Sequence, residues 1–154
     1  MKKILTLCFV LNRQEILLGL KKRGFGQGYW NGFGGKVKEN ETIEEAMLRE
    51  VKEESGLDLI EYTEVGLLEF EFINDQSLLE VHVFKSNSFA GHLQENDEMH
   101  PQWFNINQIP YEKMWLDDKY WLPLLLAGKS FQGKFKFNGN ENLLEYSVTD
   151  CTYI

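Results

Sequence analysis

The sequence is poor in cysteine and in basic residues, and it contains no hydrophobic run long enough to cross a membrane. Its two cysteines, Cys8 and Cys151, have no spacing typical of a zinc site or a disulfide framework, which favours a reducing intracellular compartment. Lysine and arginine number 16 against 24 acidic residues, so the formal net charge is −8. This balance disfavours a protein that binds a nucleic-acid duplex or a membrane surface. A phosphorylated small molecule remains possible, because a bound metal ion inverts the local charge.

The apolar start of the chain predicts a strand rather than a signal peptide. The run is short, no small-residue cleavage site follows it, and the next residues, Asn12, Arg13, Gln14 and Glu15, are polar. We therefore expect the first strand to begin close to residue 1.

The length of 154 residues fits one domain, which we place at residues 1–154. Strands and helices alternate in an order dominated by hairpins, which predicts an α+β fold with helices on both faces of a sheet. A capping-box pattern at Thr42 and a stop at Gly56 bound the first helix. A second helix lies within Asp117 to Ala127, where Pro123 either kinks it or occupies its first turn. The predicted strands are Ile4 to Leu11, Glu15 to Leu20, Thr63 to Ile73, Leu78 to Ser86, Trp103 to Ile106, Phe131 to Phe137 and Leu143 to Val148.

Three carboxylates gather near the end of the first helix, after a glycine-rich loop from Arg23 to Lys36. Since a helix advances about 100° per residue, Glu50 and Glu54 lie about 40° apart, with Glu53 beside them. A solvated face is the alternative interpretation, but the apolar stripe of the helix runs on the same side. Carboxylates crowded at a cleft repel one another, and a divalent cation relieves that repulsion. Oxygen ligands favour Mg²⁺, for which Mn²⁺ can substitute, over zinc.

The segment from Gly35 to Leu57 resembles the Nudix box, G-x5-E-x7-R-E-U-x-E-E-x-G-U, in which U is a bulky aliphatic residue. The matching residues are Gly35, Glu41, Arg49, Glu50, Val51, Glu53, Glu54, Gly56 and Leu57. The resemblance implies an α/β/α sandwich on a mixed sheet and metal-assisted hydrolysis of a pyrophosphate bond. It also implies that Glu50, Glu54 and the Gly34 carbonyl bind metal, that Glu53 binds or tunes it, and that Glu98 makes a further contact. We count Arg49, Glu50, Glu53, Glu54 and Glu98 as the candidate catalytic residues.

Four segments outside the box resemble the Nudix subfamily that clears oxidised purine nucleoside triphosphates. They are Leu20 to Val37, Phe70 to Phe72, Asp97 to Met99 and Met114 to Leu126. The subfamily hydrolyses 8-oxo-dGTP and 2-hydroxy-dATP to the nucleoside monophosphate and pyrophosphate, so we expect the same of this chain. Leu116 and Leu79 depart from the subfamily pattern and are expected to retune the base pocket.

The expected substrate-binding residues have side chains suited to a purine nucleotide. Flat bases stack on aromatic walls, although each aromatic side chain taken alone could equally belong to the core. Two adjacent carboxylates in an aromatic pocket should push their pKa values apart and leave one neutral, unless they only cap the second helix. We hypothesise that exchanging the neutral partner admits both oxidised guanine and oxidised adenine. The residues are Thr6, Lys21, Phe25, Asn31, Phe70, Phe72, Trp115, Asp117, Asp118 and Trp121.

The sequence leaves several points open. Either Glu53 or Glu98 could take the proton from the attacking water, and neither the attacked phosphorus nor the number of metal ions is fixed. Alternatives are a hydrolase of alkylated purine triphosphates, a Nudix enzyme with another nucleoside diphosphate-linked substrate, and a non-catalytic nucleotide-binding module. We expect a monomer in the cytoplasm, with nuclear or mitochondrial pools as alternatives, that binds neither nucleic acid nor membrane.

Overall fold

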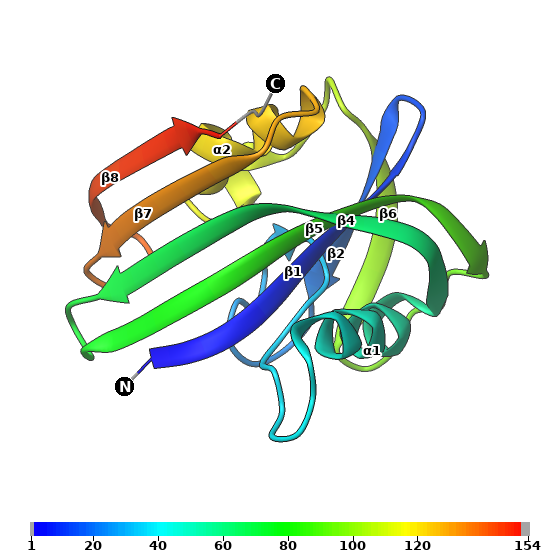
Figure 1. Ribbon diagram of the computed structural model, residues 1–154, viewed down its shortest axis with the longest axis horizontal. Coiled ribbons are helices and arrows are strands. Elements are labelled where there is room, and N and C mark those ends of the chain that lie inside the picture. The colour runs from blue at the N-terminus through cyan, green and yellow to red at the C-terminus, as the bar shows by residue number, and fades with distance from the viewer. Residues whose placement is uncertain (1, 152–154) are drawn as a thin grey trace.

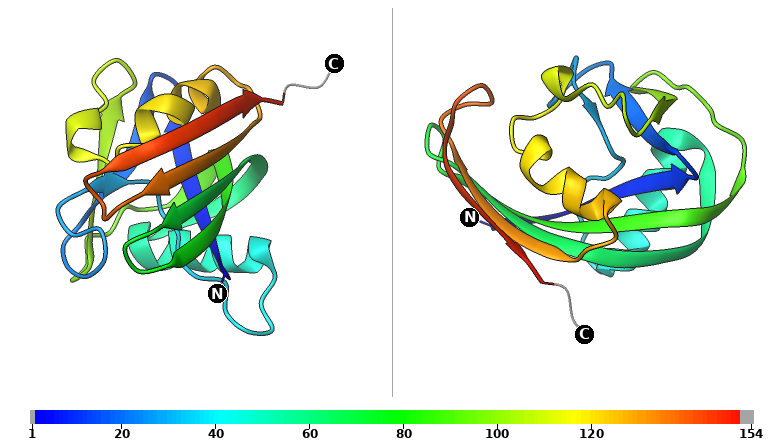
Figure 2. Two further views of the ribbon diagram at one scale, coloured as in Figure 1. Left: turned by 90° about the vertical axis from the view of Figure 1, so that its left-hand side faces the viewer. Right: turned by 90° about the horizontal axis from the view of Figure 1, so that it is seen from above.

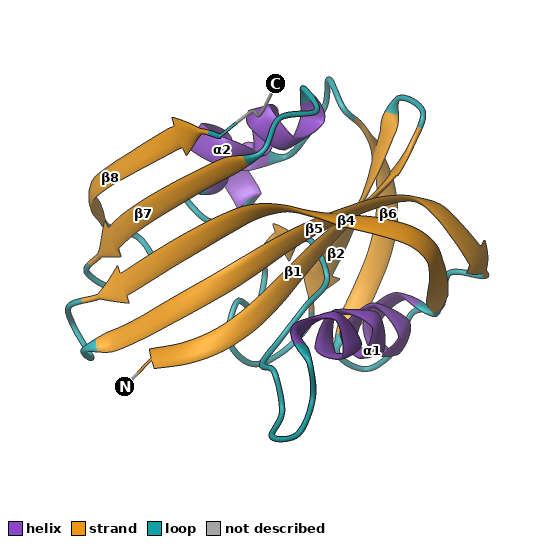
Figure 3. Cartoon of the chain, viewed as in Figure 1, coloured by secondary structure: helices purple, strands orange, loops and turns teal. Residues whose placement is uncertain are grey.

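A computed structural model describes residues 2–151 of the chain, so the two ends of the predicted domain, residue 1 and residues 152–154, lie outside it. Within this part, eight strands form one sheet in the order β3-β2-β1-β5-β4-β7-β8, and β6 pairs with β2 (Figures 1 and 3). The strands are β1 Lys2–Asn12, β2 Glu15–Lys21, β3 Trp30–Asn31, β4 Leu57–Phe72, β5 Ser77–Gly91, β6 Met99–Asn105, β7 Phe131–Phe137 and β8 Leu143–Asp150.

The sheet is mixed, as predicted. Strand β1 runs parallel to β5 and β4 runs parallel to β7, whereas β1–β2, β4–β5 and β7–β8 are antiparallel pairs. The sheet curves around the second helix, α2 (Asp118–Leu126), as Figure 2 shows from above. This curvature creates the hollow in which the candidate site lies.

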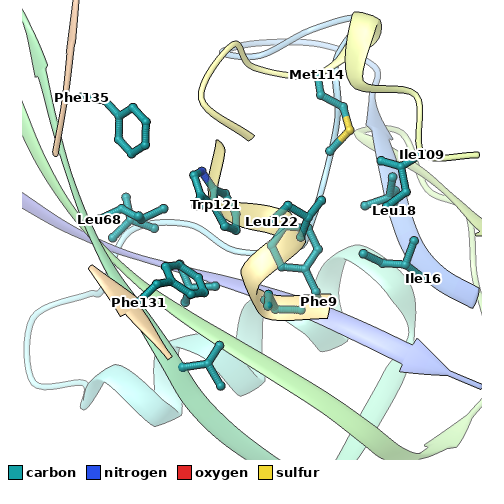
Figure 4. Close-up of a cluster of buried hydrophobic side chains, with 14 of the residues drawn as sticks. Phe9, Ile16, Leu18, Leu68, Ile109, Met114, Trp121, Leu122, Phe131 and Phe135 are labelled. Carbon is teal, nitrogen blue, oxygen red and sulfur yellow. The ribbon is translucent and has the colours of Figure 1, made fainter. Parts of the chain in front are cut away.

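Two cores lie on opposite faces of the sheet. Neighbouring residues of a strand point to opposite faces, and in β1 Phe9 joins the core beneath α2 while Cys8 joins the core beneath the first helix, α1 (Ile43–Ser55). Figure 4 shows the larger core, in which Trp121 and Leu122 of α2 pack near Phe9. The predicted α+β sandwich is therefore confirmed. Burial raises the pKa of the Cys8 thiol to about 12, so this group stays protonated.

Both ends of α1 follow the local sequence signals. The Thr42 side chain accepts a hydrogen bond from the Glu45 backbone N–H, and the Glu45 side chain accepts one from the Thr42 N–H. Gly56 ends the helix in the left-handed conformation, with φ 85°, and its N–H donates to the Lys52 carbonyl. The helix that carries the acidic residues is thus fixed at both termini by its own sequence.

The second helical region is less regular. A short 3₁₀ turn, η1 (Tyr111–Lys113), precedes α2. Pro123 lies in the middle of α2, so the prediction that it occupies the first turn is wrong.

Four predictions about the strands need correction. Strand β5 ends at Gly91 rather than Ser86, and β6 begins at Met99 rather than Trp103. Strand β4 begins at Leu57 rather than Thr63. The sequence pattern missed its first residues because register shifts between Leu59 and Gly66 break the alternation that identified the strand. Strand β3 pairs with β2 inside the segment predicted to be a glycine-rich loop. Among residues 2–151, no helix has both the length and the apolar character needed to cross a bilayer.

Candidate active site

A cavity of about 280 Å³ lies between the curved sheet, the glycine-rich segment and the start of α2. All ten residues that the sequence predicts to bind substrate line it. Strand β1 contributes Thr6, β2 contributes Lys21 and β3 contributes Asn31. The remaining seven are Phe25, Phe70, Phe72, Trp115, Asp117, Asp118 and Trp121.

One wall of the cavity is aromatic. Phe70 and Phe72 share a face of β4 and stack on Phe135 and Phe137 of β7, with ring centroids 5.5 and 5.3 Å apart. The Trp115 ring stands edge-on to Phe72 at 6.3 Å. Because the β4 rings are held by rings behind them, the wall is rigid before any ligand arrives, and it suits a flat heteroaromatic ligand.

The mouth of the cavity lies beside a segment rich in glycine. Gly24, Gly26 and Gly28 all have positive φ values, which glycine adopts without strain. Between them, Phe25 packs against Trp115 at 5.2 Å while 72% of its surface stays exposed. An exposed aromatic ring beside the partly buried Trp115 therefore lines the entrance of the cavity.

The end of the cavity carries a buried pair of carboxyl groups. Asp117 is 3% exposed and Asp118 is 2% exposed. Asp117 Oδ2 accepts a hydrogen bond of 2.7 Å from Trp121 Nε1, whereas Asp118 Oδ2 has no partner in the protein. Neither carboxylate caps α2, because Asp117, at the N-cap position, makes no side-chain cap bond. Capping therefore does not explain the pair.

Burial raises the pKa of both carboxyl groups. For Asp118, burial is followed by repulsion from Asp117 and by a hydrogen bond between the two groups, which together hold its pKa well above the ordinary range. For Asp117, the hydrogen bonds from Trp121 and Asp118 oppose the effect of burial on the pKa. The causes that raise the pKa are thus stronger at Asp118 than at Asp117, and this asymmetry is what a pair with one neutral and one ionised group requires.

A second unpartnered polar atom faces the same space. Thr6 Oγ1 is buried without a hydrogen-bond partner in the protein. The backbone of Thr6 pairs with the glycine-rich segment, since its N–H donates to the Gly35 carbonyl at 2.9 Å. A Cβ atom on Gly34 would lie 1.8 Å from the Thr6 carbonyl oxygen, so no other residue fits there. Asn31 Oδ1 accepts a bond from the Gly32 N–H, which orients its side chain.

The acidic end of α1 adjoins the cavity through Glu54. Its Oε1 accepts a hydrogen bond of 2.9 Å from the Gly34 N–H. Burial, followed by repulsion from Glu50, raises the pKa of Glu54 to about 8. The glycine segment runs close to the second acid as well, because a Cβ atom on Gly35 would lie 2.3 Å from Glu50 Oε2. Two crowded carboxylates beside a backbone carbonyl form an oxygen-rich site that a divalent cation would stabilise.

Arg49 organises the acids, and one of its partners is Glu53 at the i+4 position that helix spacing favours. It donates to Glu41 from Nε and Nη2 at 2.7 and 3.0 Å, to Glu50 at 2.6 Å and to Glu53 at 3.4 Å. The hydrogen bonds from Arg49 lower the pKa of Glu41 to about 2. The carboxylate of Glu45, one turn before Arg49 in the helix, is engaged in the capping box instead.

Glu53 and Glu98 are not among the residues that line the cavity. Their side chains are 56% and 58% exposed, and Glu98 forms an ion pair of 3.4 Å with Arg23. Within residues 2–151, no three acidic, histidine or cysteine side chains come close enough to enclose a cation by themselves. Glu50 and Glu54 supply two carboxylates, so a divalent cation held here would take its remaining ligands from backbone carbonyls, water and substrate phosphates.

Some lining residues escaped prediction from the sequence. Met99 and Tyr29 both face the cavity. Met99 reaches it because β2 carries Gly19 opposite, where a Cβ atom would lie 2.5 Å from the Met99 sulfur. The small residue within the apolar run of β2 was the available signal for this close approach.

Comparison with known proteins places the geometry in context. The NUDIX domain family model matches residues 1–125. The chain is 49% identical over 148 residues to proteins named oxidized purine nucleoside triphosphate hydrolase from Danio rerio and Mus musculus, covering 96% of this chain and 95% of each relative. The crystal structure of a MutT protein from Bacillus halodurans superposes with a TM-score of 0.86 at 24% identity, covering 95% of this chain and 97% of the other.

Proposed function

Because this chain belongs to the NUDIX domain family, we propose that it hydrolyses oxidised purine nucleoside triphosphates, among them 8-oxo-dGTP and 2-hydroxy-dATP. The products are the nucleoside monophosphate and pyrophosphate, and the activity removes damaged precursors from the nucleotide pool. The observation that carries the proposal is the buried Asp117–Asp118 pair, which faces an aromatic cavity with one carboxyl oxygen unpartnered. The relatives named for this activity cover nearly the whole chain and support the same conclusion.

The cavity end selects the base. The rings of Phe70, Phe72 and Trp115 stack against the purine, with about 1–3 kcal/mol gained per stacked base. Asp117 and Asp118 read its polar edge, and Asn31 adds a further contact from the glycine-rich segment. Since the pair holds one shared proton, moving that proton from Asp118 to Asp117 reverses the donor and acceptor pattern offered to the base.

The sugar is placed between the base and the acids. Thr6 offers an unpartnered hydroxyl, and Lys21 lies where its charge acts on Glu54. These two side chains link the base-selecting end to the phosphate end of the site.

Glu50, Glu54 and the Gly34 carbonyl would hold Mg²⁺, or Mn²⁺ in its place, at the phosphate end, with Glu53 and Glu98 as outer contributors. A bound ion would neutralise the phosphate charge and activate the attacking water. Arg49 fixes Glu50 and Glu53 relative to each other by donating to both. The side chains of Glu53 and Glu98 are more than half exposed, and one of them would accept the proton of that water.

Comparative kinetics test the proposal. We expect kcat/KM for 8-oxo-dGTP to exceed that for dGTP by roughly 5- to 150-fold, because an unsatisfied polar contact at the base costs about 1–3 kcal/mol. Turnover should require a divalent cation. A preference for ADP-ribose, or for an alkylated purine triphosphate over both oxidised ones, would contradict the substrate assignment. Absence of phosphate release with Mg²⁺ present would indicate a binding module instead.

We also propose that the single domain of residues 1–154 acts as a monomer. Its place of action is the cytoplasm, with nuclear or mitochondrial pools as alternatives. Fractionation of cells and the molar mass in solution test these two statements.

A further inference from the structure

The connection between β5 and β6, residues 92–98, passes both the end of α1 and the edge of the cavity. One side chain in it, Asn96, takes part in three hydrogen bonds to backbone groups. None of the residues assigned above to base or metal binding makes such a set. The connection is therefore held mainly through a residue that has no direct role in the proposed chemistry.

The amide oxygen of Asn96 shapes the turn that leads into β6. Oδ1 accepts hydrogen bonds from the N–H groups of Glu98 at 2.8 Å and Met99 at 2.9 Å. The Asn96 N–H donates to the Met99 carbonyl at 3.1 Å and closes the turn. Met99 faces the cavity, so the turn sets the position of a lining side chain.

The amide nitrogen of Asn96 holds the end of α1. Nδ2 donates to the Glu53 carbonyl at 2.9 Å, one of the last carbonyls of the helix, which have no partner within it. The neighbouring N–H of Gln94 satisfies the Ser55 carbonyl in the same way, at 2.9 Å. The last turn of α1, which carries Glu53 and Glu54, is thus tied to the connection.

The same connection is tied to the substrate side. The Lys22 N–H donates to the Glu98 carbonyl at 2.8 Å, and Lys22 directly follows the cavity residue Lys21. The backbone of Glu98 is therefore anchored on both sides, while its carboxylate remains exposed. The backbone of this acid is therefore fixed in advance, while its carboxylate pairs with Arg23 at the surface.

We propose that Asn96 is a positioning residue that holds Glu98, Met99 and the acidic end of α1 in one arrangement. The inference rests on the proposed function, in which Glu98, Met99 and the acidic end of α1 all act on the same substrate. Asparagine suits the position because it offers a donor and an acceptor from one short planar group. Aspartate lacks the donor, and alanine lacks both.

Two substitutions separate the effect of the Asn96 amide donor from that of its acceptor. In Asn96→Asp the acceptor for Glu98 and Met99 remains, but the donor to Glu53 is lost and a carboxylate faces a carbonyl. We expect the affinity for Mn²⁺ alone, measured by calorimetry, and kcat to fall about tenfold or more, as for other residues that orient metal ligands. Binding of 8-oxo-dGMP without metal should change less than twofold, because the turn and Met99 keep their places. In Asn96→Ala both the metal affinity and the affinity for 8-oxo-dGMP should fall.

Gln94→Glu is the matched control, because it adds the same charge to the same connection at an exposed side chain without a hydrogen bond that the structure records. If Asn96→Asp equals Gln94→Glu in Mn²⁺ affinity and kcat, the inference is overturned. It is also overturned if Asn96→Asp weakens metal and 8-oxo-dGMP binding equally, since that pattern indicates general loosening. Lack of wild-type turnover on 8-oxo-dGTP would instead overturn the proposed function, while the Mn²⁺ titration would still decide the role of Asn96.

Discussion

The two ends of the site are built in opposite ways. The base-selecting end is buried and stacked, and its polar atoms at Asp118 and Thr6 are left without partners inside the protein. At the acidic end, by contrast, Glu41 and Glu53 are already paired with Arg49, and Glu98 is paired with Arg23. The first end is preorganised, whereas the second keeps its charges balanced until the ion and the phosphates arrive. Discrimination between bases should therefore depend on the base-selecting end, and kcat should depend on the acidic end.

The largest expected effect comes from Glu54→Gln at the acidic end. Removing a charged ligand should cost several kcal/mol in the transition state, or roughly a 10³-fold loss in kcat. The amide oxygen can still accept from the Gly34 N–H, so the local fold should persist. Tryptophan fluorescence should report unchanged binding of 8-oxo-dGMP without metal. Near-normal turnover in both Glu54→Gln and Glu50→Gln would contradict the metal assignment.

Asp118→Asn tests the base-selecting end. The amide copies the neutral carboxyl group but can never ionise, so it should penalise one oxidised base more than the other. An unsatisfied buried polar group costs about 1–3 kcal/mol. We therefore expect the ratio of kcat/KM for 8-oxo-dGTP and 2-hydroxy-dATP to change by roughly 5- to 150-fold. The same substitution at the exposed Asp97 is the control. Equal losses for both substrates at every pH would exclude the proton exchange.

Phe25→Ala tests whether Phe25, at the mouth of the cavity, contributes to base binding as the aromatic wall does. Phe25 is largely exposed, so its stacking should lie near the lower limit, about 1 kcal/mol or a fivefold rise in KM. The effect on kcat should be negligible. Ile60→Ala removes another exposed apolar side chain, 63% exposed, and should leave KM unchanged. A large fall in kcat would mean that Phe25 acts on the chemistry rather than on base binding.

The smallest effect concerns stability. The pKa of Asp118 is raised by burial, so the folded state binds this proton more tightly than the unfolded state. Stability from this group is present below its unfolded pKa, near 4, and is lost as the pH rises toward the folded pKa. The melting temperature of Asp118→Asn should thus exceed that of the wild type near pH 7, by roughly 2–4 °C for each kcal/mol of stability gained. The difference in melting temperature should be smaller near pH 4. Asp97→Asn, at an exposed position, is the matched control.

Local patterns predicted much of this molecule, and long-range pairing accounts for what they missed. The capping box at Thr42 and the alternation around Phe70 depend on near neighbours, and both are as predicted. The Arg49–Glu41 pair joins the helix to the loop before it, so spacing within the helix could not reveal it. Similarly, Met99 enters the cavity only because β6 pairs with β2 at Gly19. Sequence resemblance named the substrate residues, but the unpartnered oxygens of Thr6 and Asp118 required the three-dimensional structure.

The burial of Cys8 makes the natural chain suitable for site-specific labelling. A thiol that stays protonated in a close-packed interior is a poor nucleophile toward maleimide reagents. The remaining cysteine, Cys151, is partly accessible and follows β8. A single fluorophore can therefore be attached at Cys151 without engineering. Energy transfer from the tryptophans to this fluorophore would follow unfolding of the protein in real time.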